Sequence, residues 1–162
     1  MIEYNNLALA FDPFQDYYKV DYYWKKAIDS CEKKSRLTRG SWYARLFKRH
    51  KSDYTQWSPR ILKGTLTLRY ADFLFNNQEH DACRQQFRTA IELFDFDRDQ
   101  AHWQAGWAFI IWSRIERMSE QIELSKECLK NAKLTYSKLK NERMRLSGMQ
   151  LVEQEISRAP TQ

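Results

Sequence analysis

The sequence predicts an all-α fold. It contains only four Gly and three Pro in 162 residues, and it has no Asn-Gly or Asp-Gly pair of the kind that marks β-hairpins. Apolar residues recur instead at the three- and four-residue spacing of helices that are buried on one face. The length suits one domain, so we expect residues 1–162 to form a single helical domain, built of antiparallel hairpins in a repeat-like array or in a compact bundle.

The composition argues against a membrane or secreted protein. The longest apolar run lies around residues 107–112, well short of the ~20 residues that cross a bilayer. The first residues show no basic and apolar signal pattern. Cys31, Cys83 and Cys128 are odd in number and far apart, each at an apolar position of a helical pattern. We therefore expect buried, reduced thiols and a cytoplasmic location, with no membrane contact.

Capping signals predict where the first helices begin. Asp12-Pro13 and Ser58-Pro59 each place a hydrogen-bond acceptor at the N-cap and proline at the first helical position. The helix from Ser58 is expected to end near residues 76–78. The buried stripe predicted after the first signal is Tyr17, Val20, Trp24, Ala27 and Cys31.

Three further segments carry helical patterns. One predicted helix buries Cys83, Phe87, Ala90, Ile91 and Phe94 on one face. After an acidic turn at 95–99, another helix runs to Met118. Residues 113–158 form long amphipathic C-terminal helices. We expect the chain to reverse near 119–123, whereas an unbroken helix over 107–140 would indicate a coiled coil with a second copy. The oligomeric state is left open.

Aromatic residues supply the predicted core. They make up 15% of the chain, and beyond residue 112 the only one is Tyr136. We expect Trp24, Phe87, Trp107 and Ile111 to lie in one core. The first two-thirds of the chain should then form an aromatic-rich core, and the last third the long amphipathic helices.

The segment 64–97 resembles one tetratricopeptide repeat, a 34-residue helix-turn-helix unit. With Gly64 taken as the first position, the matching residues lie mainly where the two helices approach; they are Ala71, Leu74, Cys83, Phe87 and Ala90. The segment departs from the family pattern at Thr67, where Trp is common, and in having no Pro at the end of the second helix. The resemblance implies a groove for a partner peptide or helix, lined by Leu68, Asp72, Phe75 and Asn76.

A second, looser unit would pair the helix 103–118 with a helix that carries Cys128, Ala132 and Tyr136. Cys83 and Cys128 are 45 residues apart, which is the family's 34 plus 11. An insertion of eleven residues adds about three full helical turns, so the same side of the helix would stay buried. The alternative is a plain helical bundle without repeats.

The sequence holds no convincing pattern of an enzyme or of a metal or cofactor site. The four Gly form no phosphate-binding loop, and His80 and Cys83 have metal-like spacing but no second pair. Asp95, Asp97 and Asp99 resemble the start of a calcium loop, yet Gly and Glu are missing where that loop needs them. We therefore predict no catalytic residues, no metal and no cofactor, and we expect a solvated interhelix turn at 95–99.

A basic, aromatic-rich segment at 33–60 is the most unusual part of the chain. From Lys33 to Arg69 there are 11 Lys and Arg and a single acid, Asp53. Cations can neutralise phosphates while flat rings stack on unpaired bases. The segment could equally dock on an acidic protein or be a solvated helix face. Its candidate binding residues are Arg36, Arg39, Trp42, Arg45, Lys48, Arg49, Lys51, Trp57 and Arg60.

Two functions follow from these patterns. The first is a non-enzymatic protein–protein interaction module, such as a scaffold, adaptor or chaperone, which binds a partner's peptide or helix in a helical groove. The second is a small basic nucleic-acid-binding subunit of a larger ribonucleoprotein or replication complex, acting through residues 33–69. We rank the interaction module first, because a repeat-like fold predicts partner binding more directly than charge predicts nucleic acid.

Overall fold

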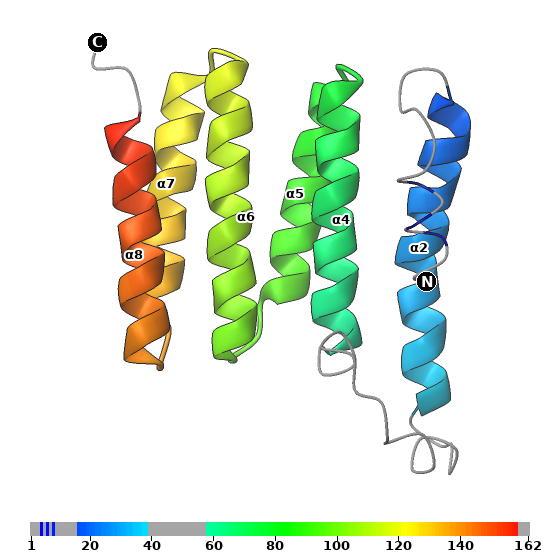
Figure 1. Ribbon diagram of the computed structural model, residues 1–162, viewed down its shortest axis with the longest axis horizontal. Coiled ribbons are helices and arrows are strands. Elements are labelled where there is room, and N and C mark those ends of the chain that lie inside the picture. Colours follow the sequence, from blue (N-terminus) through cyan, green and yellow to red (C-terminus); the bar gives the residue numbers. More distant parts are fainter. Residues whose placement is uncertain (1–3, 5, 7, 9–15, 39–57, 159–162) are drawn as a thin grey trace.

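Helices account for all regular secondary structure in the part of the chain that the computed structural model describes, which is residues 4, 6, 8, 16–38 and 58–158 (Figure 1). This confirms the all-α prediction. The helices with described bounds are α2 (Tyr17–Thr38), α4 (Pro59–Asn76), α5 (His80–Phe94), α6 (Asp99–Met118), α7 (Ile122–Ser137) and α8 (Glu142–Ser157).

The caps explain two of the helix starts. Pro59 begins α4 as predicted, and the hydroxyl of Ser58 accepts a hydrogen bond from the Ile61 backbone at 3.2 Å. In the same way, the amide oxygen of Asn141 accepts from the backbone of Met144 at 3.1 Å and starts α8. The predicted start at Asp12-Pro13 lies outside the described residues.

The helices form two layers. In Figure 1, α2, α4, α6 and α8 stand side by side in a first layer, while α5 and α7 lie behind them in a second layer. Each helix of the second layer forms an antiparallel hairpin with the first-layer helix before it and packs on the one after it. First-layer helices also contact one another directly. In Figure 1, α4, α6 and α8 run parallel, and their C-terminal ends lie at the same end of the layer.

The two hairpins, α4–α5 and α6–α7, repeat one turn geometry at a fixed spacing. The turns after α4 and α6 have left-handed backbone at Gln78 (φ 64°) and Glu120 (φ 60°), which are the only non-glycine residues with positive φ among those described. We call the separation of these two residues in the sequence the hairpin period. His80 and Ile122, which begin the helices after the two turns, are separated by the same period.

The hydrogen bonds around the two turns also match one for one. In the first turn, the backbone amides of Asn77 and Glu79 donate to the carbonyls of Phe73 and Leu74. One hairpin period later, Ser119 donates to Ile115 and Gln121 donates to Glu116. The second hairpin therefore repeats these two hydrogen bonds of the first turn.

Three glycines are spaced by the same hairpin period. A Cβ on Gly64 would lie 2.5 Å from the ring of Phe94, and one on Gly106 or Gly148 would lie 2.5 Å from the ring of Tyr136. Glycine therefore lets each of α4, α6 and α8 approach an aromatic ring of the second layer. The ring of Tyr136 in α7 lies against both glycines, Gly106 of α6 and Gly148 of α8. Two first-layer helices therefore pack on the same aromatic ring through glycines at equivalent positions.

This period corrects the offset expected from the cysteines. The predicted reversal at 119–123 is confirmed, since α6 ends at Met118 and α7 begins at Ile122. The hairpin period, however, is shorter than the separation of Cys83 and Cys128. Ser125, buried in α7, takes the place of Cys83 in α5, and Cys128 lies one turn further along. Both cysteines are buried, but they do not occupy equivalent positions.

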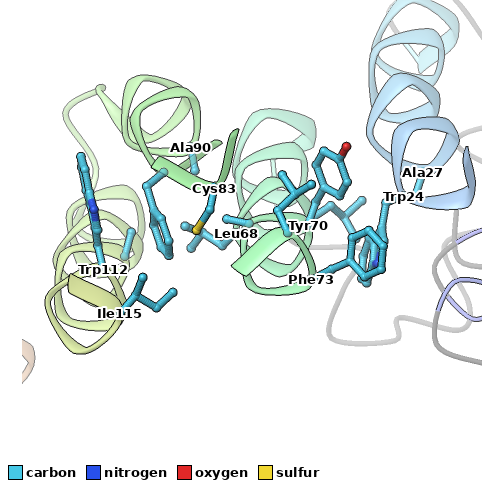
Figure 2. Packing of buried hydrophobic residues seen from close by; sticks show 14 of the residues in the cluster. Trp24, Ala27, Leu68, Tyr70, Phe73, Cys83, Ala90, Trp112 and Ile115 are labelled. Atoms are coloured by element: carbon cyan, nitrogen blue, oxygen red, sulfur yellow. The ribbon is translucent and has the colours of Figure 1, made fainter. Parts of the chain in front are cut away.

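The buried side chains form two clusters. The larger one extends from α2 through α4, α5 and α6 to Cys128 of α7, and Figure 2 shows part of it, from Trp24 on α2 to Trp112 on α6. Phe87 is fully buried there and stacks on Trp112 with ring centroids 5.6 Å apart. The prediction of one core was wrong for Trp107, which is only partly buried and packs on the smaller cluster between α6, α7 and α8.

The acidic turn before α6 binds the turn before α8. The carboxylate of Asp99 accepts hydrogen bonds from the backbone amides of Lys140 and Asn141, both at 2.8 Å. Asp97 forms an ion pair with Lys140 at 2.8 Å. These contacts lower the pKa of both aspartates, through the amides at Asp99 and through the Lys140 side chain at Asp97. The segment 95–99 is thus an interhelix turn, as predicted.

Candidate protein-binding surface

The C-terminal ends of α4, α6 and α8 carry exposed and half-exposed side chains at equivalent positions. Asp72, Arg114 and Ile156 are related by the hairpin period, and so are Asn76 and Met118. Because the three helices run parallel and lie side by side, these residues share one end of the first layer, uppermost in Figure 1. We call these five residues the distal surface.

Two apolar side chains of the distal surface are strongly exposed. Met118 is 64% exposed at the end of α6, and Ile156 is 46% exposed near the end of α8. Trp107, about three turns before the end of α6, adds a half-buried ring beneath the guanidinium of Arg114, 5.6 Å from the ring centroid. Apolar surface of this kind is costly to leave in water when it is contiguous, and it is common where proteins bind one another.

Three arginines surround one buried carboxylate beside this apolar surface. Glu155 of α8 accepts hydrogen bonds from Arg114 at 2.5 Å, from Arg158 at 3.0 Å and from Arg117 at 3.4 Å. The hydrogen bond from Arg114 is the main reason that the pKa of Glu155 is lowered, against the effect of burial. The carboxylate is therefore ionised at neutral pH. We call these four residues the arginine cluster.

Asp72 has a different electrostatic environment on α4. Its side chain is exposed on one side, and protein surrounds it on the others, so that desolvation raises the pKa of its carboxyl. Among the described residues it has no ion-pair partner. Asp72 is thus an acid that would gain from a cation or a hydrogen-bond donor supplied by a ligand.

The predicted groove residues do not all reach the surface. Asp72 and Asn76 are exposed, but Leu68 is only 6% exposed and lies in the larger core cluster, so it cannot contact a ligand there. Phe75 is half-buried and its ring lies edge-on to His80, with centroids 5.4 Å apart. Leu68 is one helical turn from Asp72 but about 40° away from it around the helix, and its side chain lies in the larger core cluster.

Most of the basic, aromatic-rich segment lies outside the described residues. This holds for Arg39, Trp42, Arg45, Lys48, Arg49, Lys51 and Trp57, and also for the side chain of Arg36. Arg60 is described, and its guanidinium donates to the backbone carbonyls of Glu92 at 2.9 Å and Asp95 at 3.4 Å while it lies over the ring of Phe96. Arg60 therefore caps the C-terminal end of α5.

Sequence reasoning missed the residues on α6 and α8. Arg114, Arg117 and Met118 stand one hairpin period after Asp72, Phe75 and Asn76, so the spacing of the glycines could have located them. Glu155 and Arg158 carry no such signal. Their importance depends on a contact between α6 and α8 that the sequence does not reveal.

Other kinds of site find no support in the described residues. Across 16–38 and 58–158, no group of three or more His, Cys, Asp and Glu is placed to hold a metal ion. None of the helices in these ranges is both long and apolar enough to span a membrane. No protein-family model matches this chain, and neither a curated protein nor a solved structure is similar to it.

Proposed function

We propose that this chain is a non-enzymatic protein–protein interaction module whose distal surface binds a peptide or helix of a partner. The exposure of Met118 and Ile156 at equivalent ends of neighbouring helices is the observation that carries the proposal. Fully burying such a side chain contributes about 1.5–3 kcal/mol. Because micromolar binding corresponds to about 8 kcal/mol, the polar groups around the two side chains must contribute as well.

The packing of the first hairpin supports a divergent relation to tetratricopeptide repeats. Ala71, Cys83, Phe87 and Ala90, which carry the resemblance in sequence, are all buried in the larger core cluster. Small residues at such positions let two helices approach closely, and the aromatic ring fills the space between hairpins. The hairpin period would correspond to a lengthened version of that repeat. In arrays of this type one layer of helices presents the binding surface.

A displayed peptide library tests the proposal directly. Peptides should be selected on the wild-type protein and then tested on a Met118→Lys variant, which places a charge in the distal surface. Leu134→Lys is the matched control, because Leu134 is 59% exposed on α7 in the second layer. We expect the selected peptides to lose binding to the Met118 variant alone. If the selected peptides bind both variants as tightly as they bind the wild-type protein, the distal surface is not the binding site.

The thiols support a cytoplasmic location for this module. Cys31, Cys83 and Cys128 are free and buried, and burial raises the pKa of Cys83 and Cys128 to about 12. Free thiols are typical of a reducing compartment. Mass spectrometry of protein isolated with a thiol-blocking reagent would test this, and a disulfide or mixed disulfide at any of the three would contradict it.

Nucleic-acid binding is the second candidate, and the observation that favours it is the charge of residues 33–69. With 11 Lys and Arg against one acid, this part of the chain would release counterions from a phosphate backbone. Single-stranded RNA or DNA should then bind with an affinity that falls steeply with salt, and charge reversal at Arg45, Lys48 and Arg49 should weaken this binding. Absence of binding at low salt would exclude this function.

A further inference from the structure

The arginine cluster carries more positive charge than its one carboxylate neutralises. Arg114, Arg117 and Arg158 contribute three positive charges and Glu155 one negative charge, which leaves a surplus of two. No other carboxylate among the described residues lies within ion-pair distance of any of the three guanidinium groups. The excess is therefore available to an anion from outside the chain.

The guanidinium groups also keep unused donors. Each arginine has five N–H groups, whereas those of the cluster make one or two hydrogen bonds each. Their side chains are 37% exposed at Arg114, 21% at Arg117 and 65% at Arg158, while Glu155 beneath them is buried. The free donors consequently face solvent above a fixed base.

The shape of the cluster favours one compact anion with two charges. The three side chains converge on the two oxygens of a single carboxylate, so their exposed edges lie close together. Two carboxylates brought to this point would repel each other, whereas a phosphate monoester carries about two charges and three acceptor oxygens on one atom. Arginine forks match phosphate oxygens in pairs, which makes arginine the common residue in such sites.

The apolar neighbours indicate that the phosphate belongs to a polypeptide. Met118 lies one helical turn after Arg114 on the same face of α6, and Ile156 occupies on α8 the position equivalent to Arg114. Resting on the proposed function, we propose that the distal surface binds a partner segment that contains a phosphorylated serine or threonine beside an apolar residue. The arginine cluster holds the phosphate, and Met118 and Ile156 contact the apolar side chain.

Three degenerate nine-residue peptide libraries test this inference, with phosphoserine, glutamate or serine fixed at the centre. We expect immobilised protein to retain the phosphoserine library at least about tenfold better than the other two, the effect of one or two charge-assisted hydrogen bonds. Retention should weaken between pH 7.5 and pH 5.5, because the phosphate loses its second charge near pH 6. Nuclear magnetic resonance signals of the arginine Nε–H groups should shift at Arg114, Arg117 and Arg158.

Matched variants locate the site. Arg158→Gln removes one surplus charge, and since this side chain is largely exposed, thermal unfolding should remain unchanged. Arg143→Gln is the control, since Arg143 is exposed on the same helix without a described ion pair. Retention of the phosphoserine library should fall about fivefold or more in the first variant only. If the retention of the phosphoserine library fell equally in both variants, the arginine cluster would not be the phosphate-binding site.

The outcomes separate this inference from the function on which it rests. Equal retention of the glutamate and phosphoserine libraries would overturn phosphate recognition. If displayed peptides still require Met118 in that case, the proposed peptide-binding function stands, but without phosphate recognition. If no displayed peptide depends on Met118 and no library is retained, both proposals fall.

Discussion

Glu116 of α6 and Arg84 of α5 form a two-point hydrogen-bonded ion pair in the protein interior. Nε and Nη2 of Arg84 donate to the two carboxylate oxygens of Glu116, each at 2.8 Å, and Glu116 is fully buried. The indole of Trp112 donates to the same carboxylate at 2.7 Å. This pair ties the first hairpin to the helix that begins the second.

Removing the charge of Glu116 should strongly destabilise the fold. A Glu116→Gln substitution leaves Arg84 only its exposed partner Asp81 and should cost about 1.5–3 kcal/mol in the free energy of unfolding, measured by urea titration. Glu153→Gln is the control, because Glu153 pairs with Lys133 at the surface and should cost less than about 1 kcal/mol. Similar losses in the two variants would mean that the buried pair contributes no more than an exposed one.

Stability should decrease at acid pH. Burial opposes the charged form of Glu116, but the hydrogen bonds from Arg84 and Trp112 outweigh it, and the pKa is lowered. A carboxyl whose pKa is lower in the folded than in the unfolded state stabilises the fold above the unfolded pKa, near 4.3, and this contribution is lost as the pH falls through the folded value. Glu155 acts in the same direction.

Urea midpoints between pH 7 and pH 3 measure this effect. We expect the midpoint to fall below about pH 4.5 in the wild-type protein and to fall less steeply in Glu116→Gln, which lacks one of the carboxylates whose pKa is lowered in the fold. A midpoint that stays constant over this range would show that Glu116 and Glu155, together with Asp97 and Asp99, add no net stability above their unfolded pKa values.

The hydroxyl of Tyr136 should contribute nothing to stability. It is buried without a hydrogen-bond partner among the described residues, and Phe94 fills the equivalent place in the first hairpin. Tyr136→Phe should therefore leave the free energy of unfolding unchanged or raise it by up to about 1 kcal/mol. The reciprocal Phe94→Tyr change should cost about 1–3 kcal/mol, because it buries an unpaired hydroxyl. A loss on removing the Tyr136 hydroxyl would point to a bridging water.

Phe87 should be one of the largest single contributors to the core. Its ring is fully buried between α4 and α6, so Phe87→Ala should cost about 3–5 kcal/mol in urea unfolding. Leu134→Ala, at an exposed site on α7, should change stability by less than about 0.5 kcal/mol. If the two substitutions had equal effects, the larger core cluster would be wrongly assigned.

Local signals in the sequence predicted most helix positions. The start of α4 at Pro59 and the reversal after Met118 follow from capping and from the amount of apolar surface that needs cover. The three- and four-residue spacing also identified Phe87 and Tyr136 as buried. These features depend on residues close together in the chain, which is why periodicity finds them.

The position of each residue around a helix was harder to predict. Leu68 and Asp72 share one side of α4 by spacing, yet Leu68 is buried in the larger core cluster and Asp72 is exposed. Trp107 was assigned to the main core because α6 is apolar on several sides, and the sequence does not say which neighbour covers which side. The arginine cluster needs the approach of α6 to α8, a contact between segments far apart in the chain.

The hairpin period also determines how far along the chain each contact extends. Every extensively packed pair among the described helices is either consecutive or separated by one helix, so none of these interfaces requires the two ends of the chain to meet. Proteins built from such local contacts tend to fold quickly, and their stability is close to a sum over units and the interfaces between neighbours. Among the described residues α8 has neighbours on one side only, so it can open without unfolding the rest, and its amides should exchange with solvent before those of α4, α5 and α6.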